Sequence, residues 1–503
     1  MNPSFPILTL LVVFPLVAAA VLWLVKPLHG HARIYGLIAA LIEFALVIVA
    51  LTMFDLGNAG EVQLVEQVSW IPRLGVSWAL GVSGLGLAMI VLAIFLVVVV
   101  IIAREPGEGG PDWLWVSLVL SLAAVMVGVF AARDVFLFYI LFEVMLIPVY
   151  FLIGTFGGPD RRRAALKFLL YSLAGGLIML IGVIALFGYG PGGPDAYLID
   201  SLAGNLAASA TAENLIFVSF FIAFAIKAPM VPVHTWLPDS TQQADAGTST
   251  LLVGVLDKVG TFGMITLCLP LFPNASVWAA PTIVVLAVIS IIYGGLEAIA
   301  QKDFMRLVAM TSVSHFGFIV LGIFIGSQIA MAGAMLYMIA HGVSTAALFL
   351  TLGFLEKRGN SQWIPNYRGM QRVTPVLAGL FLTAGLSSIA LPGLSGFVPE
   401  WLVLTGTFEV NYWAAFFAVL GVITAAIYIL LPYQRMFTGP KEEGIRGAVD
   451  LNAREKTAMV PLVIAALLLG FFPAPALDMV TPVAEQAVVA VRTEPTTTVA
   501  MGD

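Results

Sequence analysis

The segment from Phe224 to Asp239 reads FAIKAPMVPVHTWLPD and interrupts an otherwise apolar stretch. Lys227 stands two residues before Pro229, where a membrane-spanning helix would reach the middle of a bilayer. A charged side chain at that depth costs roughly 2.5–3.5 kcal/mol, so it faces the interior of a helix bundle and marks a functional path. Pro229 lacks an N–H group, so the carbonyl of Ala225 is expected to be free beside the lysine. The segment therefore predicts a broken membrane-spanning helix.

The composition of the chain places it in a membrane. Of its 503 residues, 60% are hydrophobic and 10% are charged, and the mean hydropathy is +1.02. A soluble protein carries about a quarter of charged residues, far more than this chain has. Continuous apolar runs of about 20 residues favour helices over a β-barrel. The single cysteine, Cys268, excludes an internal disulfide, a CxxC redox pair and an iron–sulfur cluster held by this chain alone.

Fourteen apolar windows are long enough to cross a bilayer and predict an all-α polytopic membrane protein with about 14 transmembrane helices. Eighteen of the 23 Lys and Arg residues lie in or beside the loops of one face, against three on the other. The positive-inside rule places the basic face in the cytoplasm and both termini on the outer face. The tail 493–503 is too polar to span. The predicted spans are 5–25, 33–54, 79–103, 113–131, 134–156, 164–189, 214–237, 247–270, 281–300, 303–325, 329–355, 373–405 (interrupted), 411–437 and 457–478.

Two of these spans, 214–237 and 373–405, carry the same interruption by prolines. They are five helices apart, and an odd offset inverts the topology, which predicts two inverted five-helix repeats, each with a Pro-broken helix. Paired broken helices in such repeats are the sequence pattern that marks a transport path. The predicted units are three N-terminal helices in 1–110, the first repeat in 111–270, the second repeat in 281–440, and a last helix with a polar tail in 441–503.

Ionisable residues occur inside six spans and predict a polar axis across the bundle. In the second broken span, Glu400 follows Pro399 directly. A single intramembrane histidine is also explained by helix packing, and the hydroxyl groups beside His315 and His341 either hold water or bond to their own helix. Six groups in six spans favour the axis. The candidate site residues are Glu143, Lys227, Lys258, His315, His341 and Glu400, with His234, Asp239 and Asp257 as further candidates.

Several motifs resemble those of the antiporter-like subunits of respiratory complex I, and the resemblance covers nearly the whole chain. Mrp-type Na+/H+ antiporters and membrane-bound hydrogenases contain similar subunits. The glutamate of the broken twelfth span, where sister subunits usually carry lysine, is similar to the type called subunit M or chain 4. The matching stretches are FEVMLIPVYFLIG (142–154), IKAPMVPVHTWLPD (226–239), GVLDKVG (254–260), LVAMTSVSHFGF (307–318) and MIAHGVSTAALF (338–349).

The resemblance implies a role for each candidate. Glu143 and Lys227 correspond to the family's glutamate of span 5 and lysine of span 7, and Lys258 to its central lysine. His315 and His341 match the connecting histidines, and Glu400 matches the terminal acid. Three positions depart from the family pattern at the cytoplasmic entry to spans 7 and 8, where Asp257 is expected to share the charge of Lys258. These positions are Thr241 in place of histidine, Asp245 in place of proline and Asp257 in place of an apolar residue.

The function implied by the resemblance is proton translocation by a membrane-arm subunit of NADH-quinone oxidoreductase in the bacterial plasma membrane. The chain would be a non-redox pumping subunit of this translocase. It would hold no cofactor or metal, and FMN, iron–sulfur clusters and quinone would lie in partner subunits. Its partners would be other membrane-arm subunits, especially two sister antiporter-like subunits, and the lipid bilayer, with no nucleic acid. The alternatives are the equivalent subunit of an Mrp-type antiporter or hydrogenase complex, and a structural scaffold whose polar axis is vestigial.

Overall fold

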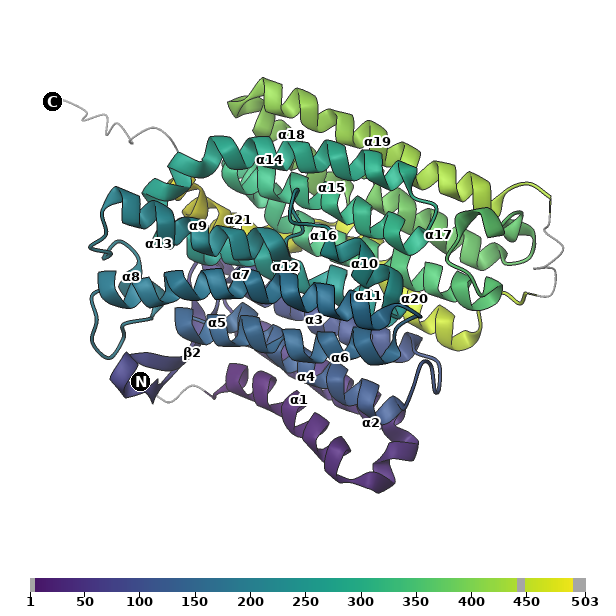
Figure 1. Cartoon of the computed structure of the whole chain (residues 1–503), viewed down its shortest axis with the longest axis horizontal. Helices are drawn as coiled ribbons and strands as arrows, with labels where there is room; N and C mark the ends of the chain where they lie inside the picture. The colour runs from purple at the N-terminus through teal and green to yellow at the C-terminus, as the bar shows by residue number, and fades with distance from the viewer. Residues whose placement is uncertain (1–4, 441–447, 492–503) are drawn as a thin grey trace.

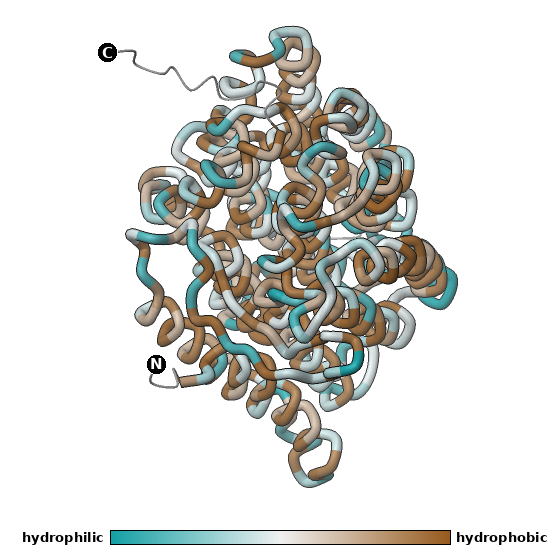
Figure 2. Tube along the Cα trace, turned by 90° about the vertical axis from the view of Figure 1, so that its left-hand side faces the viewer, coloured by the Kyte–Doolittle hydropathy of each residue, from teal (hydrophilic) through white to brown (hydrophobic). Residues whose placement is uncertain are grey.

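Roughly parallel helices packed side by side make up most of the molecule (Figure 1). The computed structural model describes residues 5–440 and 448–491, so the predicted polar tail 493–503 lies outside the described residues. In Figure 2, seen along the helices, hydrophobic residues predominate in the helices and many hydrophilic residues lie in the loops that face the viewer. The lengths and composition of the helices confirm an all-α polytopic membrane protein.

The described helices are taken here in two successive groups along the chain, and the first group ends in several short helices. The first group comprises α1 (Ile7–Leu24), α2 (Ala32–Met53), α3 (Gly84–Ala103), α4 (Asp112–Ala131), α5 (Val135–Val144), α6 (Leu146–Phe156), α7 (Arg161–Tyr189), α8 (Ile199–Leu202), α9 (Ala210–Lys227), α10 (Trp236–Gln243), α11 (Ala246–Leu251), α12 (Lys258–Gly263) and α13 (Leu269–Leu271). The second group comprises α14 (Pro273–Ala300), α15 (Phe304–Phe324), α16 (Gln328–Gly359), α17 (Pro375–Ser388), α18 (Phe397–Val410), α19 (Tyr412–Phe437), α20 (Ala453–Phe471) and α21 (Ala474–Val488).

The number of spans differs from the predicted fourteen. Among the described residues, 12 helices are long and apolar enough to cross a membrane, or 13 if α20 and the bent segment after it form one span. The difference lies in the interrupted span 373–405, which forms α17 and α18 with 14 residues each. At 1.5 Å per residue, each of these helices is about 21 Å long, short of a hydrocarbon core of about 30 Å. Fourteen spans are reached only if α17 and α18 cross together, and that count is not confirmed.

Helix breaks occur where the sequence removes or widens the backbone hydrogen-bond ladder. α5 ends at Val144 because Pro148 has no N–H to donate to the carbonyl of that residue. The predicted span 247–270 is interrupted by two π-helical segments, η4 (Leu252–Leu256) and η5 (Met264–Cys268), which flank α12. π-Helical turns are rare and occur often at functional sites.

The prediction of a free Ala225 carbonyl beside Lys227 is wrong. Met230 N–H donates to that carbonyl at 3.0 Å, because the chain after α9 widens into a five-residue hydrogen-bonded turn. The neighbouring carbonyl of Ile226 accepts from the indole Nε1 of Trp236 at 2.9 Å. The protein's own donors therefore satisfy the break after α9, and these two carbonyls do not serve as partners for the lysine.

A β-hairpin that the sequence pattern did not predict lies between α2 and α3. Its strands β1 (Gln63–Ile71) and β2 (Val76–Val82) pair antiparallel at the left end of the molecule in Figure 1. The Glu66 carboxylate accepts from the backbone N–H groups of Leu8 and Thr9 at 2.7 and 2.9 Å. The hairpin thus fixes the start of α1, which has no side-chain cap of its own.

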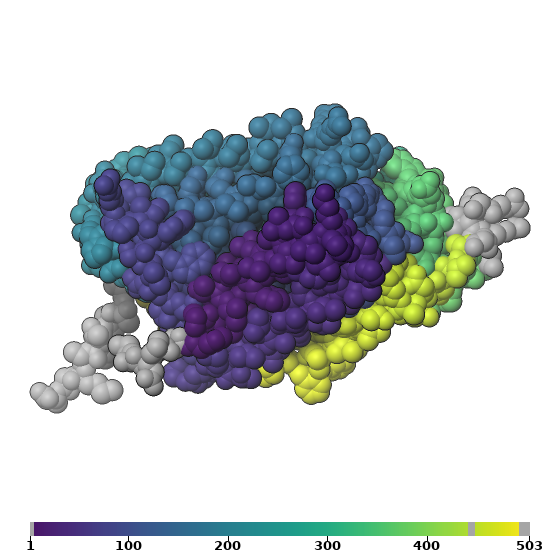
Figure 3. Space-filling model, turned by 90° about the horizontal axis from the view of Figure 1, so that it is seen from below, coloured from purple at the N-terminus to yellow at the C-terminus, as the bar shows by residue number. Residues whose placement is uncertain are grey.

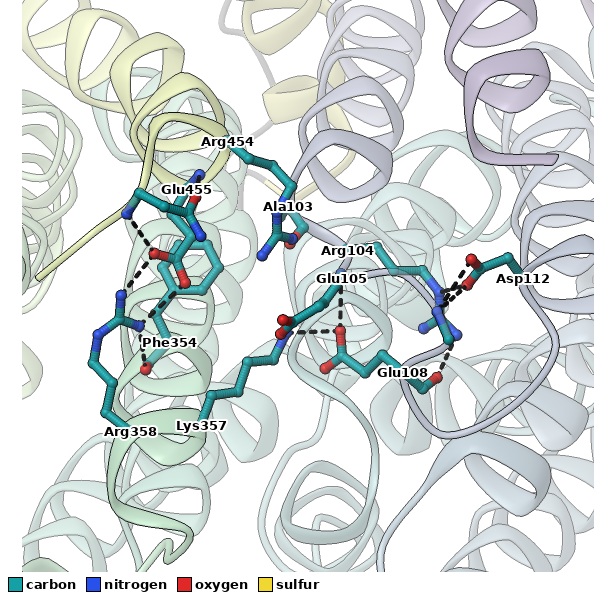
Figure 4. Close-up of polar contacts among 12 residues, drawn as sticks. Ala103, Arg104, Glu105, Glu108, Asp112, Phe354, Lys357, Arg358, Arg454 and Glu455 are labelled. Atoms are coloured by element: carbon teal, nitrogen blue, oxygen red, sulfur yellow. Dashed lines mark hydrogen bonds and ion pairs between the residues drawn. The ribbon is translucent and has the colours of Figure 1, made fainter. Parts of the chain in front are cut away.

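Charged residues tie the loop between α3 and α4 to the ends of α16 and α20 (Figure 4). Lys357 Nζ lies 2.7 Å from a carboxylate oxygen of Glu108. Arg358 donates to both carboxylate oxygens of Glu455, from Nη2 at 2.7 Å and from Nη1 at 3.1 Å. These contacts hold the C-terminal helices, yellow in Figure 3, beside the N-terminal helices, shown in purple.

Candidate functional site

The candidate residues lie at a similar depth in the bundle. Lys258, His315 and His341 stand near the middle of the helical segments Ala246–Leu271, Phe304–Phe324 and Gln328–Gly359. Glu143 stands at the kink in the middle of Val135–Phe156, and Lys227 and Glu400 lie beside the helix breaks. All of them except the partly buried Glu143 are buried. They therefore follow a line across the bundle, perpendicular to the helices.

The centre of this line is a direct contact between Lys258 and His341. Lys258 Nζ lies 2.6 Å from His341 Nδ1 and donates to the carbonyl of Val253 at 2.5 Å. An ammonium group has no acceptor, so a protonated Lys258 donates to His341, and a neutral Lys258 accepts from a protonated Nδ1. The pair can therefore share one proton.

Two glycines let the helices that carry this pair approach closely. Gly254 in η4 faces Gly342 in α16, and a methyl group added at Gly342 would lie 2.8 Å from the carbonyl oxygen of Gly254. This is closer than real Cβ contacts, so the approach requires glycine. Lys258 Nζ donates to the Val253 carbonyl, which belongs to η4.

Histidines and tyrosines continue the line from His341 towards Glu400. The rings of His341 and His315 are 5.2 Å apart between centroids and nearly perpendicular. His315 Nε2 lies 3.0 Å from the hydroxyl of Tyr428, and Tyr337 donates its hydroxyl to Glu400 Oε2 at 2.7 Å. The ring centroids of His315 and Tyr337 are 5.8 Å apart.

Sequence reasoning did not predict the two tyrosines. Tyr337 precedes His341 by four residues on the same helix, a spacing that puts both side chains on one face. That spacing was a usable signal. Tyr428 has no ionisable neighbour within one helical turn in α19, so only the packing of α19 against α15 reveals it.

The hydroxyl groups beside the histidines bond to their own helices. Thr311 and Ser312 donate to the carbonyl of Val308, at 2.8 and 3.2 Å. Ser344 donates to the carbonyl of His341 at 3.3 Å. Of the two explanations that the sequence left open for these hydroxyls, the structure therefore favours bonding within the helix.

At the other end of the line, Lys227 and Glu143 act on each other by charge without forming an ion pair within 4.0 Å among the described residues. Lys227 Nζ lies 5.1 Å from the ring centroid of Phe142 and 5.4 Å from that of Phe168, which are cation–π contacts. Glu143 packs against α7 at Gly176, where an added methyl group would lie 1.7 Å from Glu143 Oε1. The pair is therefore open in this conformation.

Asp239 lies apart from the line, at the ends of α7, α10 and α15. Its carboxylate accepts from Lys167 Nζ at 2.6 Å and from Arg306 Nη1 at 2.5 Å. Burial acts to raise the pKa of Asp239, but these two hydrogen bonds outweigh it and hold the pKa below its usual value. His234, in the turn after α9, packs edge-on against Tyr293 at 5.3 Å between ring centroids. Asp239 is thus held in a structural ion-pair cluster.

One buried carboxylic acid was not among the residues predicted from the sequence. Glu43 stands at the middle of α2 and is 2% exposed, and neither carboxyl oxygen has a hydrogen-bond partner in the described part of the chain. A single acidic residue within the apolar stretch LIAALIEFALV was a clear signal for it. α2 packs against α1, α3 and α4 and makes no substantial contact with the helices of the line, so Glu43 does not join it.

Within residues 5–440 and 448–491, no group of three His, Cys, Asp or Glu residues is placed to bind a metal.

Comparisons with known proteins match most of the chain. Residues 132–427 fit the family described as "NADH:quinone oxidoreductase/Mrp antiporter, TM". An NADH-quinone oxidoreductase subunit M of Mycobacterium tuberculosis is 41% identical over 96% of this chain and 94% of its own length. The subunit M of Rhodobacter capsulatus is 36% identical over 95% of each chain.

Solved structures give the same picture. A chain of respiratory complex I from Thermus thermophilus with bound NADH has a TM-score of 0.87 and 32% identity, and the match covers 96% of this chain and 100% of that one. A chain of the Mrp complex from Dietzia sp. has a TM-score of 0.84 and covers 97% and 100%, but at 21% identity this likeness concerns the fold alone. The family match contains every residue of the line from Glu143 to Glu400, and Tyr428 stands one residue beyond its end.

Proposed function

Because the chain belongs to the NADH:quinone oxidoreductase/Mrp antiporter family, as an antiporter-like membrane subunit of the complex I type, we propose that it moves protons along the buried line from Glu143 to Glu400. The relatives above 30% identity are subunits of NADH-quinone oxidoreductase, which favours this assembly over an Mrp-type antiporter. The driving energy would come from redox chemistry in partner subunits that hold FMN, iron–sulfur clusters and quinone.

The contact between Lys258 and His341 is the observation that carries this proposal. A proton that leaves Lys258 Nζ binds His341 Nδ1, 2.6 Å away, and His341 can then release the proton on Nε2. Neither His341 Nε2 nor His315 Nδ1 has a hydrogen-bond partner among the described residues. Transfer between the two rings needs a bridging water or a small ring rotation, because their centroids are 5.2 Å apart. The tyrosine hydroxyls then relay the proton towards Glu400.

Glu143 and Lys227 would form the switch at the start of the path. A negative charge close to Lys227 favours its protonated form, and separation of the two groups lets the lysine release its proton. The described conformation, in which no ion pair within 4.0 Å joins the two groups, corresponds to the releasing state. Lysine suits this task because its protonation changes readily with its surroundings, unlike that of arginine.

The arrangement of the assembly is part of the same proposal. Both termini would lie on the outer face of a bacterial plasma membrane, and the two inverted repeats would occupy 111–270 and 281–440. The neighbours would be sister antiporter-like subunits of the membrane arm. The helix breaks that follow α9 and α17 support the inverted repeat. An ionisable residue lies beside each break, Lys227 beside the first and Glu400 beside the second.

Two substitutions test the switch in the complete oxidoreductase reconstituted into vesicles. Glu143→Gln and Lys227→Ala should each lower proton ejection per NADH oxidised about tenfold or more, since an opposite charge at close range changes the protonation equilibrium of its neighbour about 10- to 1000-fold. Ejection is followed with a pH-sensitive dye, and assembly is checked by co-purification of the other subunits.

Glu43→Gln is the matched control for these variants. It neutralises a carboxyl group that is also buried within a helix but lies away from the line, so proton ejection should stay at the level of the unchanged protein. Normal ejection in either Glu143→Gln or Lys227→Ala would refute the switch, and so would an equal loss in the control.

Tyr337→Phe tests the relay to Glu400. The change removes a hydrogen bond to a carboxylate, worth about 1.5–3 kcal/mol, and should reduce proton ejection about tenfold in the same vesicle assay. Tyr197→Phe removes the hydroxyl of a buried tyrosine in the loop between α7 and α8 and should leave ejection unchanged. Unchanged ejection with Tyr337→Phe would exclude this hydroxyl from the path.

A further inference from the structure

Asp257 is a fully buried carboxylic acid without a visible structural task. It is 0% exposed, and neither carboxyl oxygen accepts a hydrogen bond from any described residue. No ion pair within 4.0 Å joins it to a described basic residue. Burial of a polar group without a hydrogen bond costs about 1–3 kcal/mol or more, and burial of a charge costs still more. Packing alone would be better served by an apolar side chain.

Other buried carboxylates in the chain show what a structural role looks like. Asp134 accepts backbone N–H groups at the start of α5, and Asp303 does the same at the start of α15. Asp257 instead lies in helical conformation inside the continuous segment Ala246–Leu271, between η4 and α12, and its side chain makes no capping hydrogen bond. It therefore has no capping role like that of the other two carboxylates.

Asp257 is next to one lysine of the line and on a helix that packs against the helix of the other. It directly precedes Lys258, and α12 packs against α9, which carries Lys227. Gly260 lies on the same side of the helix, three residues further on, and a methyl group there would be 2.5 Å from the carbonyl oxygen of Phe224 in α9. The face of α12 that carries Asp257 therefore packs directly on the end of α9, where Lys227 is the last residue.

Few other groups near the Asp257 carboxyl can accept and release a proton. Lys227 is the last residue of α9, which packs on this part of the helix, and Lys258 follows Asp257 in its own helix, whereas His341, from α16, is hydrogen-bonded to Lys258. Glu143 acts on Lys227 from α5. Unlike a methyl or amide group, the carboxylate can accept a proton from one lysine and return it to another.

We propose that Asp257 carries the proton between Lys227 and Lys258. The protonated Lys227 gives its proton to the carboxylate, leaving a neutral amine and a carboxylic acid, and the acid then protonates the neutral Lys258 and becomes a carboxylate again. Each step breaks one N–H or O–H bond and forms another, with no other reactant. The inference rests on the proposed function and adds the group that links its two lysines.

The test uses the complete oxidoreductase in vesicles with the variants Asp257→Asn and Asp257→Glu. Asp257→Asn keeps the shape but binds no proton, so proton ejection per NADH oxidised should fall to the level of Lys258→Ala. Asp257→Glu keeps the carboxyl group and should restore most of the ejection. Co-purification of all subunits and unchanged NADH oxidation in detergent verify that each variant assembles.

A spectroscopic measurement separates proton transfer from a purely structural effect. The infrared difference spectrum between the NADH-reduced and oxidised complex should contain a carboxylic acid band that Asp257→Asn removes and Glu43→Gln leaves in place. Normal ejection with Asp257→Asn would overturn the inference. Retained ejection with only a shifted pH profile would also overturn it, since Asp257 would then be a counter-charge alone.

The two proposals fail in different ways. If Lys258→Ala pumps normally, the proposed path itself is wrong. If Lys258→Ala loses pumping while Asp257→Asn retains it, only the role of Asp257 is wrong. If Asp257→Asn fails to assemble, Asp257→Glu tests the inference in its place. The carboxylic acid band of Asp257→Glu should then shift in the infrared spectrum and not vanish.

Discussion

Lys258→Ala should reduce proton ejection per NADH oxidised at least about 100-fold, the lower range for removal of a general acid–base group. Lys258 has the shortest contacts on the line, with His341 Nδ1 at 2.6 Å and the Val253 carbonyl at 2.5 Å. Alanine removes the group that hands the proton to His341 on the proposed path, and no other described side chain forms a hydrogen bond with His341 Nδ1. Ejection is measured in vesicles that contain the complete oxidoreductase.

Lys258→Arg separates charge from proton transfer at the same position. Arginine keeps a positive charge but does not release its proton, so this variant should assemble and yet pump no better than Lys258→Ala. Lys26→Ala, which removes an exposed lysine in the loop between α1 and α2, is the matched control and should pump normally. Substantial pumping by Lys258→Arg would show that the site needs only a charge.

The largest effect on stability is expected for Arg358→Ala. Arg358 and Glu455 are nearly buried, with 11% and 4% of their side chains exposed. Loss of one partner from a buried ion pair leaves the other charge unpaired and costs about 3–5 kcal/mol. The arginine also holds backbone groups on both sides of the contact, so its loss releases α20 from α16. The carbonyls that accept from it are those of Phe354, Val449 and Asp450.

Alkylation of Cys268 provides the measurement. This cysteine is buried in η5 and is the only one in the chain, so its reaction with a maleimide reports opening of the bundle within the complex. In Arg358→Ala, the temperature of half-maximal alkylation should fall by several degrees. Arg133→Ala is the control, because its partner Asp200 is 77% exposed and such surface pairs contribute about 0–1 kcal/mol. An equal fall in both variants would contradict the expected role of the buried pair.

The sequence predicted the helices because each apolar stretch must satisfy its own backbone within the bilayer. It also predicted Lys258, His315 and His341 as candidate site residues, since an ionisable residue at that depth is costly enough to stand out by type alone. The sequence did not predict which of these residues contact one another. Lys258 and His341 are 83 residues apart, and their contact depends on the approach of Gly254 to Gly342.

The errors have the same origin. The Ala225 carbonyl was expected to be free because a proline removes a donor locally, but Met230 N–H supplies another one through the wider turn. Tyr428 was not predicted because it becomes a candidate only through the contact of its hydroxyl with a ring nitrogen of His315, which lies on another helix. Local rules thus predict which groups are costly to bury, whereas packing decides which groups satisfy them.

The placement of the line at the mid-depth of the bundle has an electrical consequence. A charge that crosses a membrane works against the transmembrane potential, at about 2.3 kcal/mol per 100 mV. Lys258, His315 and His341 each stand near the middle of their helices, so a proton that moved among them on the proposed path would stay at nearly constant potential. On that path the voltage would act on the entry and exit of the proton, and the lateral steps between these groups would proceed at the same rate whether the membrane is energised or not.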